Sequence, residues 1–313
     1  MPARAKIAII GAGGNVGASC ALWAAAKELG DIVAVDIPQA EGTVKGRMLD
    51  LAQAMPIERA DATITGTTSY ADIADSDVVV ITAGLPRKPG MSRDDLIEKN
   101  VQIVRQVSEN VKKHAPGAIV IVVSNPLDAM VYTAWKTTGF DTHRIVGQAG
   151  ALDVARFKTF IAMETGYSVE DVNALLLGGH GDDMVPLPRF TNIAGIPVTQ
   201  FISEQRLKEL VDRAKVGGGE IVKLMGTSAY FAPAAGAIAM ATSYLFDQKR
   251  VLPCAAYLQG EYGHKDMYMG VPVVIGKDGV EKVVEIQLTD EEKQLLDKSA
   301  EHVKELVQAA SKL

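Results

Sequence analysis

Five polar residues in three separate segments have the chemistry to hold a small doubly charged anion and to move one proton. They are Arg87 and Arg93, then Asp153 and Arg156, and finally His180. Arginine binds carboxylates through a planar fork of donors, and histidine exchanges a proton near neutral pH. A neighbouring carboxylate favours the charged form of histidine. Together these residue types predict a site for a small dianionic substrate.

Each of these residues also has an ordinary interpretation. Asp153 and Arg156 share one face of a predicted helix, where such a pair commonly stabilises only the helix. His180 follows the apolar run 174–177, at a predicted strand end where α/β proteins build sites, but it can equally be a loop residue with no task. The basic segment 86–92 is either a surface loop or a lid that carries positive charge over a bound anion.

A glycine-rich turn, Gly11-Ala-Gly-Gly-Asn-Val-Gly17, stands between an apolar run and a predicted helix. Glycines allow a tight turn and close approach to a pyrophosphate, whose charge meets the free N–H groups of the helix N-terminus. The spacing departs from G-x-G-x-x-G, because Val16 stands where the third glycine is expected and Gly13 is additional. Asp36 ends the next predicted strand, where it can bind both ribose hydroxyls and repel a 2′-phosphate. The pattern favours NAD over NADP; the alternative is a structural turn and a helix-capping aspartate.

The elements that must position these residues alternate regularly in the first half of the chain. Continuous apolar runs rich in valine and isoleucine predict buried parallel strands, and the segments between them have helical spacing. The predicted strands are 6–10, 32–35, 78–82 and 119–123, and the predicted helices are 18–29, 41–54 and 93–114. This alternation predicts an α/β fold, a doubly wound parallel sheet of the Rossmann type, over residues 1–147.

The second half has a different pattern. Helical spacing recurs in 151–165, 203–225 and 233–245, and strand-like runs follow in 271–275 and 280–286. The Gly276-Lys-Asp-Gly279 segment between those runs predicts a hairpin. A last helix is expected with Thr289 as N-cap and Glu292 completing a capping box. These features predict a second, α+β substrate domain over residues 148–313.

The bulk composition excludes several classes of protein. The chain of 313 residues has 48% hydrophobic and 22% charged residues, as globular proteins do, and its net charge of −6 argues against nucleic-acid binding. Its two cysteines, Cys20 and Cys254, form no metal or redox motif. The N-terminal apolar segment 7–10 is too short for a signal peptide or a membrane span, so we expect no membrane association and a cytoplasmic location.

Several short motifs together resemble one known family from end to end. They include Ser124-Asn-Pro-Leu-Asp128, Leu152-Asp-Val-Ala-Arg156 and Gly178-Gly-His-Gly-Asp182, and further resembling segments are 83–96, 146–150 and 184–188. On these motifs the chain resembles the lactate/malate dehydrogenase superfamily, and within it the lactate-dehydrogenase-like malate dehydrogenases. The resemblance implies hydride transfer between NAD and a 2-hydroxy or 2-oxo dicarboxylic acid.

The resemblance also implies a role for each polar residue. His180 would exchange a proton with the substrate C2 oxygen, while Asp153 holds its imidazole. Arg156 would bind the C1 carboxylate, and Arg93 would stabilise charge on the C2 oxygen. Arg87 would pair with a second carboxylate, as in oxaloacetate, whereas a neutral residue there goes with pyruvate. Closing an unpaired guanidinium over a methyl group would cost several kcal/mol, or roughly a thousandfold in discrimination.

The remaining residues implied by the resemblance line the substrate and NAD sites. Asn125 would hydrogen-bond both substrate and cofactor, although an Asn-Pro pair is also an ordinary turn starter, and Thr227 or Ser228 would line the substrate pocket. The implied NAD-binding residues are Gly11, Gly13, Gly14, Asn15, Val16, Gly17, Asp36, Ala83, Gly84, Asn100, Val123 and Asn125. No metal is expected. The family forms dimers and tetramers, so we expect a homotetramer or homodimer.

Three rival interpretations remain at this stage. A lactate dehydrogenase is the nearest, and Arg87 disfavours it. An NAD-dependent glycosidase also uses a dinucleotide fold, but it needs a metal held partly by cysteine and histidine, and Cys20 and Cys254 lie in no such motif. A non-catalytic NAD-binding module would have no use for the set formed by Asp153, Arg156 and His180.

Overall fold

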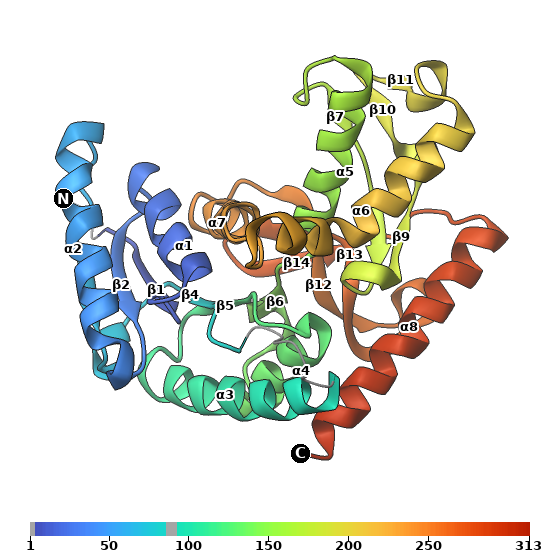
Figure 1. Cartoon of the computed structure of the whole chain (residues 1–313). Helices are drawn as coiled ribbons and strands as arrows, with labels where there is room; N and C mark the ends of the chain where they lie inside the picture. The colour runs from blue at the N-terminus through green and yellow to red at the C-terminus, as the bar shows by residue number, and fades with distance from the viewer. Residues whose placement is uncertain (1–3, 86–92) are drawn as a thin grey trace.

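The sheet at the centre of the molecule begins with six parallel strands. The computed structural model describes residues 4–85 and 93–313. The six strands lie in the order β3-β2-β1-β4-β5-β6 (Figure 1). Their bounds are β1 Lys6–Ile10, β2 Asp31–Val35, β3 Ile64–Thr67, β4 Val78–Ile81, β5 Ile119–Val122 and β6 Ile145–Gly147. The chain adds β2 and β3 on one side of β1 and then β4, β5 and β6 on the other side, which confirms the doubly wound sheet.

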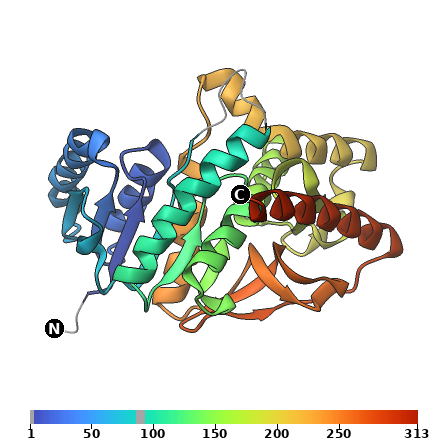
Figure 2. The same cartoon turned by 90° about the horizontal axis from the view of Figure 1, so that it is seen from below.

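Helices cover both faces of these strands, which explains why the strands are apolar on both sides. Every residue of β4 and β5 is buried. One core cluster contains side chains of α1 (Asn15–Ala26), α2 (Glu41–Glu58) and α7 (Phe231–Leu245). The cluster on the other face contains side chains of α3 (Arg93–His114) and α4 (Leu127–Thr138). Figure 2 shows α3 in teal and α4 in green lying over that face.

The second half of the chain extends the same sheet with antiparallel strands. After β6 the order continues β12-β13-β8-β9, and β14 pairs with β13. The bounds are β8 Leu176–Gly178, β9 Met184–Pro186, β12 Arg250–Gln259, β13 Lys265–Gly276 and β14 Gly279–Val283. The two halves join where Gly147 pairs with Ala255. A Cβ atom on Gly147 would lie 2.9 Å from the Ala255 Cβ atom, so glycine permits this close approach.

A third core lies beside the end of this sheet, at the upper right of Figure 1. It packs α5 (Gly150–Thr165) and α6 (Glu204–Met225) around buried residues such as Phe157. A small sheet of β7 (Val172–Asn173), β10 (Asn192–Ile193) and β11 (Ile196–Pro197) belongs to the same region. Short 3₁₀ helices join several elements, among them η4 (Gly181–Asp183).

The last helix, α8 (Asp290–Ser311), closes the chain along one side of the sheet. Thr289 Oγ1 accepts a hydrogen bond from the Glu292 main-chain N–H, and the Thr289 main-chain N–H donates one to the Glu292 carboxylate, so the predicted capping box is confirmed. The predicted hairpin is also confirmed, because Gly276 pairs with Gly279 between β13 and β14. Within residues 4–85 and 93–313, no helix combines the length and apolar character needed to cross a bilayer.

Some elements differ from the sequence-based expectation. α1 begins at Asn15 rather than residue 18, because Gly14 serves as its N-cap. β3, β6, β12 and α4 had not been predicted. β3 is a four-residue edge strand with one buried side chain, and β12 contains Pro253, so neither has a clear apolar signal. The α2 residues Met48 and Met55 are buried in the core.

Candidate active site

The structure brings His180, Asp153 and Arg156 together around one buried carboxylate. His180 follows β8 as the residue before η4, while the other two lie one turn apart on α5. Asp153 Oδ2 lies 2.8 Å from His180 Nδ1, and Asp153 Oδ1 accepts a hydrogen bond of 3.2 Å from Arg156 Nη1. Because Nδ1 is engaged, the other ring nitrogen, Nε2, is the atom that can exchange a proton with a substrate.

The electrostatics of this cluster favour a charged histidine. Burial disfavours the imidazolium, but the charge and hydrogen bond of Asp153 outweigh burial, and Asp128 adds to the same effect. Arg156 acts in the opposite direction. The net result is a His180 pKa above its ordinary value, which favours the protonated imidazole.

Arg156 is held in a partly buried position by a run of glycines. Burial lowers the pKa of Arg156, and Asp153 opposes that effect. A Cβ atom on Gly217 would lie 3.3 Å from Arg156 Cδ, and one on Gly218 would lie 3.5 Å from Nη2. These two α6 residues were not predicted from the sequence. Their signal is three consecutive glycines inside a helix, which is costly for helix stability unless something needs the space.

The turn that holds the His180 main chain is anchored by α8. The main-chain N–H of Gly179 donates to Ser299 Oγ at 2.9 Å, and His302 Nδ1 lies 2.6 Å from Asp183 Oδ1. Gly178 has a φ of +88°, which favours glycine. Side chains from a helix more than a hundred residues away therefore fix the turn in which His180 stands.

The glycine turn fits a dinucleotide, and its extra glycine has a structural reason. The Gly13 N–H donates to Asp36 Oδ2 at 2.7 Å, and a Cβ atom on Gly13 would lie 2.8 Å from that oxygen. A Cβ atom on Gly17 would lie 2.7 Å from Ala12 Cα. The N-cap of α1, Gly14, has no side chain to cap the helix, which leaves the first N–H groups of α1 available to a pyrophosphate.

The loops after β4 and β5 are tied together by Asn100, which is 1% exposed. Its Oδ1 accepts from the Leu85 N–H at 2.7 Å, and its Nδ2 donates to the Asn125 carbonyl at 2.7 Å. Ser124 Oγ also donates to the Ala83 carbonyl at 2.6 Å. These bonds place 83–84 and 123–125 beside each other at the carboxyl ends of adjacent parallel strands, where ligands of such sheets bind.

Two predicted substrate side chains lie outside what the structure describes, and two others are exposed. Arg87 lies outside the described residues, and so does the side chain of Arg93, whose main chain begins α3. Thr227 and Ser228 are exposed between α6 and α7. Nearer the glycine turn, Asn15 Oδ1 accepts a hydrogen bond of 3.0 Å from Arg47 of α2.

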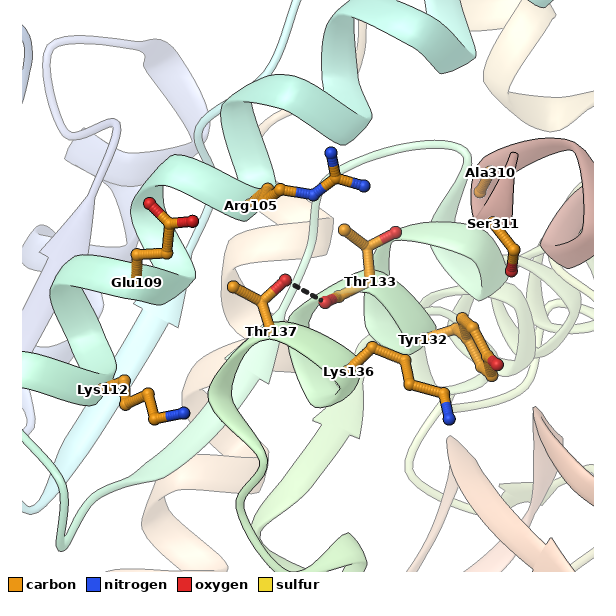
Figure 3. A pocket seen from close by; sticks show the side chains of 9 residues that line it. All are labelled: Arg105, Glu109, Lys112, Tyr132, Thr133, Lys136, Thr137, Ala310 and Ser311. Atoms are coloured by element: carbon orange, nitrogen blue, oxygen red, sulfur yellow. Dashed lines mark hydrogen bonds between the residues drawn. The ribbon is translucent and has the colours of Figure 1, made fainter. Parts of the chain in front are cut away.

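One groove in the described part of the structure is lined by other residues. It has a volume of about 660 Å³ and lies between α3, α4 and the end of α8, where Figure 3 shows Arg105, Lys112 and Lys136 around it. Among the described residues that line it, none belongs to the predicted site. The same described part of the chain contains no group of three potential metal-binding side chains of histidine, cysteine, aspartate or glutamate. The candidate site therefore rests on side-chain geometry and not on cavity size.

Comparison with known proteins accounts for almost the whole chain. Residues 5–147 match the NAD-binding domain of lactate/malate dehydrogenases, and residues 150–313 match the α/β C-terminal domain of the same family. The chain belongs to the lactate/malate dehydrogenase family. Membership confirms the predicted resemblance, identifies the first half as an NAD-binding domain and makes the chain an oxidoreductase.

Individual relatives match nearly the full length of the chain. The chain is 58% identical to the malate dehydrogenase of Rhodopirellula baltica over 97% of this chain and 96% of that protein. The crystal structure of Cryptosporidium parvum malate dehydrogenase superposes with a TM-score of 0.96 and 45% identity, covering 99% of this chain and 100% of that one. A lactate dehydrogenase from the same organism, complexed with lactic acid and nicotinamide adenine dinucleotide, has a TM-score of 0.95 and 40% identity with both chains fully covered.

Proposed function

We propose that this chain is an NAD-dependent malate dehydrogenase that interconverts (S)-malate and oxaloacetate. The observation that carries the proposal is the contact of one buried carboxylate, Asp153, with both His180 and Arg156. This arrangement supplies a proton donor and a carboxylate-binding cation on the same side of the site. The family relatives named malate dehydrogenase support the choice of substrate.

The residues of the cluster divide the chemistry between them. Bound NADH would supply the hydride for substrate C2 in reduction, and NAD⁺ would accept it in oxidation. Protonated His180 gives its Nε2 proton to the C2 oxygen during reduction, and the neutral ring takes it back during oxidation. Arg156 binds the C1 carboxylate, and Arg93 stabilises charge on the C2 oxygen, so the reaction needs no metal.

The cofactor binds along the carboxyl ends of β1, β2, β4 and β5 in this proposal. The residues around the pyrophosphate are Gly11, Gly13, Gly14, Asn15, Val16 and Gly17. Those that line the nicotinamide end are Ala83, Gly84, Val123 and Asn125. Asp36 accepts hydrogen bonds from the ribose hydroxyls. Asn100 contributes through the main-chain contacts that hold Leu85 and Asn125. Residues 1–147 thus bind NAD, while 148–313, with Thr227 and Ser228 near the substrate, complete the site.

The fold alone does not separate malate from lactate, because a lactate dehydrogenase superposes nearly as well as a malate dehydrogenase. The choice depends on Arg87, whose positive charge matches the second carboxylate of oxaloacetate. Without that carboxylate, closure of the loop would leave the guanidinium unpaired. Arg87 therefore makes lactate dehydrogenase the second candidate.

Steady-state oxidation of NADH with oxaloacetate and with pyruvate tests the proposal. The wild-type protein should strongly prefer oxaloacetate, and Arg87→Gln should lower kcat/KM for oxaloacetate by roughly a thousandfold while raising it for pyruvate. Lys88→Gln removes a neighbouring charge and serves as the matched control, with a change of about threefold or less. A preference for pyruvate in the wild-type protein would replace malate with lactate as the substrate.

We further propose that the chain works as a homodimer or homotetramer in the cytoplasm. Large apolar side chains are exposed on α2 and α6, including Leu49 at 61%, Ile57 at 82% and Leu224 at 78%. Exposed apolar surface of this kind is typical of protein contacts and supports an assembly. Sedimentation of the purified protein measures the oligomeric state directly.

A further inference from the structure

A second buried carboxylate, Asp128, lies against the main chain of His180. Asp128 is the second residue of α4 and is 4% exposed. Its Oδ2 accepts a hydrogen bond of 3.3 Å from the main-chain N–H of His180. A Cβ atom on Gly179 would lie 3.5 Å from the same oxygen, so the carboxylate packs directly against this turn. Asp128 therefore contacts the main chain of His180, whereas Asp153 contacts its imidazole ring.

Burying a carboxylate is costly unless a partner offsets the loss of water. Burial raises the pKa of Asp128 to about 6, while the N–H and the charge of His180 act to lower it and Asp183 acts to raise it. Asp183 is itself paired with His302 of α8. The charged groups facing His180 are Asp153 and Arg156 from α5 and Asp128 from α4. The histidine that carries the proton is therefore the cation that Asp128 faces.

Asp128 also lies three residues after Asn125, at the start of the same helix. Asn100 holds the Asn125 carbonyl, and α4 begins directly after Pro126. The Asp128 carboxylate consequently links the loop that carries Asn125 to the turn that carries His180. Asn125 and His180 must keep a fixed distance from each other if they are to contact the same substrate.

We propose that Asp128 is a positioning residue for the reaction. Asp128 fixes the His180 turn relative to the Asn125 loop and, together with Asp153, favours the protonated imidazole. This inference rests on the proposed function of His180 as the proton donor. Removing the Asp128 charge takes an anion away from the imidazolium, so His180 should lose its proton at a lower pH. Oxaloacetate reduction needs the proton-loaded ring, so its rate should begin to fall at a lower pH.

The test compares Asp128→Asn with wild type in oxaloacetate reduction across pH 5 to 9. The amide keeps the size of the side chain and an oxygen for the His180 N–H, but removes the charge. We expect kcat to drop roughly tenfold and the falling limb of kcat/KM to move down by about one pH unit, with the dissociation constant for NADH unchanged. Asp290→Asn makes the same change in the first turn of α8, at an exposed position, and should leave the profile in place.

A folded Asp128→Asn protein with the wild-type pH profile would reduce Asp128 to a structural residue and overturn the proposal. If the variant does not fold, the wild-type protein still provides a test. The chain has 5 histidines, so ¹⁵N-histidine labelling yields few main-chain amide signals, and loss of one in His180→Asn identifies His180. That amide should shift as Asp128 titrates near pH 6, and a flat shift would contradict the hydrogen bond. This measurement needs no turnover, whereas absence of oxaloacetate turnover in the wild type would instead reject the proposed function.

Discussion

The glycine turn and the His180 cluster are built by opposite means, although Gly11 and His180 both follow strands of one continuous sheet. The turn depends on close packing of the main chain at glycines, where there is no room for a side chain. A Cβ atom on Gly11 would lie 2.7 Å from the Ala83 nitrogen, and a Cβ atom on Gly17 would lie 2.7 Å from Ala12 Cα. The cluster consists of charged side chains in places where charge is costly, with Asp153 2% exposed. The first is therefore sensitive to added atoms, and the second to removed charges.

The difference follows from what each region has to recognise. A pyrophosphate is large and carries its own charge, so N–H groups at a helix N-terminus are sufficient if the main chain can approach. Proton transfer needs one group whose protonation is set by its surroundings. Asp153 does this by contacting both His180 and Arg156, which are then restrained by the same buried carboxylate.

Replacement of the proton donor should have the largest effect of any change in this comparison. His180→Asn keeps a hydrogen-bonding side chain of similar length but cannot transfer a proton at neutral pH. Turnover of oxaloacetate should fall by about a thousandfold or more, while NADH binding, followed by fluorescence, stays within about twofold. His143→Asn alters an exposed histidine and is the matched control. Near-normal turnover of His180→Asn would remove His180 from the mechanism.

Neutralising the shared carboxylate should have the next largest effect. Asp153→Asn leaves Arg156 and His180 without their common anion, so kcat should fall by roughly a hundredfold. Since the His180 pKa is raised in the wild type, reduction persists until the pH rises through that raised value. The variant should lose reduction at a lower pH and gain malate oxidation, which needs the neutral ring, at a lower pH as well.

Two pH profiles, one for each direction of the reaction, check this prediction. Asp171→Asn, at an exposed position, is the control for loss of one negative charge from the chain. If both limbs of the Asp153→Asn profile coincide with those of the wild type, Asp153 does not set the protonation of His180. Since Asp153 contacts the ring and Asp128 the main chain, the shift should also be larger for Asp153→Asn than for Asp128→Asn.

The two regions also differ in how far the sequence predicts them. Ile97, Val101 and Val104 recur at helical spacing within the predicted helix 93–114, and all three side chains are buried in α3. The turn could be predicted because its residues are consecutive. Asp128, in contrast, lies 52 residues from the His180 that it contacts, and only the folded chain brings them together. Gly217 and Gly218 carry a local signal, but their reason, the space for Arg156, lies on another helix.

The smallest effect should come from adding a single methyl group to the turn, and it tests whether main-chain approach is what this region requires. In Gly17→Ala the new Cβ atom would lie 2.7 Å from both Ala12 Cα and the Gly11 oxygen, so the turn must move away from α1. We expect about a tenfold weaker affinity for NADH, equivalent to roughly 1.4 kcal/mol, with kcat little changed at saturating NADH. Gly46→Ala adds the same methyl group inside α2 with no atom within 4 Å, and should raise the free energy of unfolding by about 0.5–1 kcal/mol without changing NADH affinity. Equal NADH affinities in a fluorescence titration of the two variants would mean that the turn tolerates a side chain. The glycine turn would then not differ from the His180 cluster in its sensitivity to added atoms.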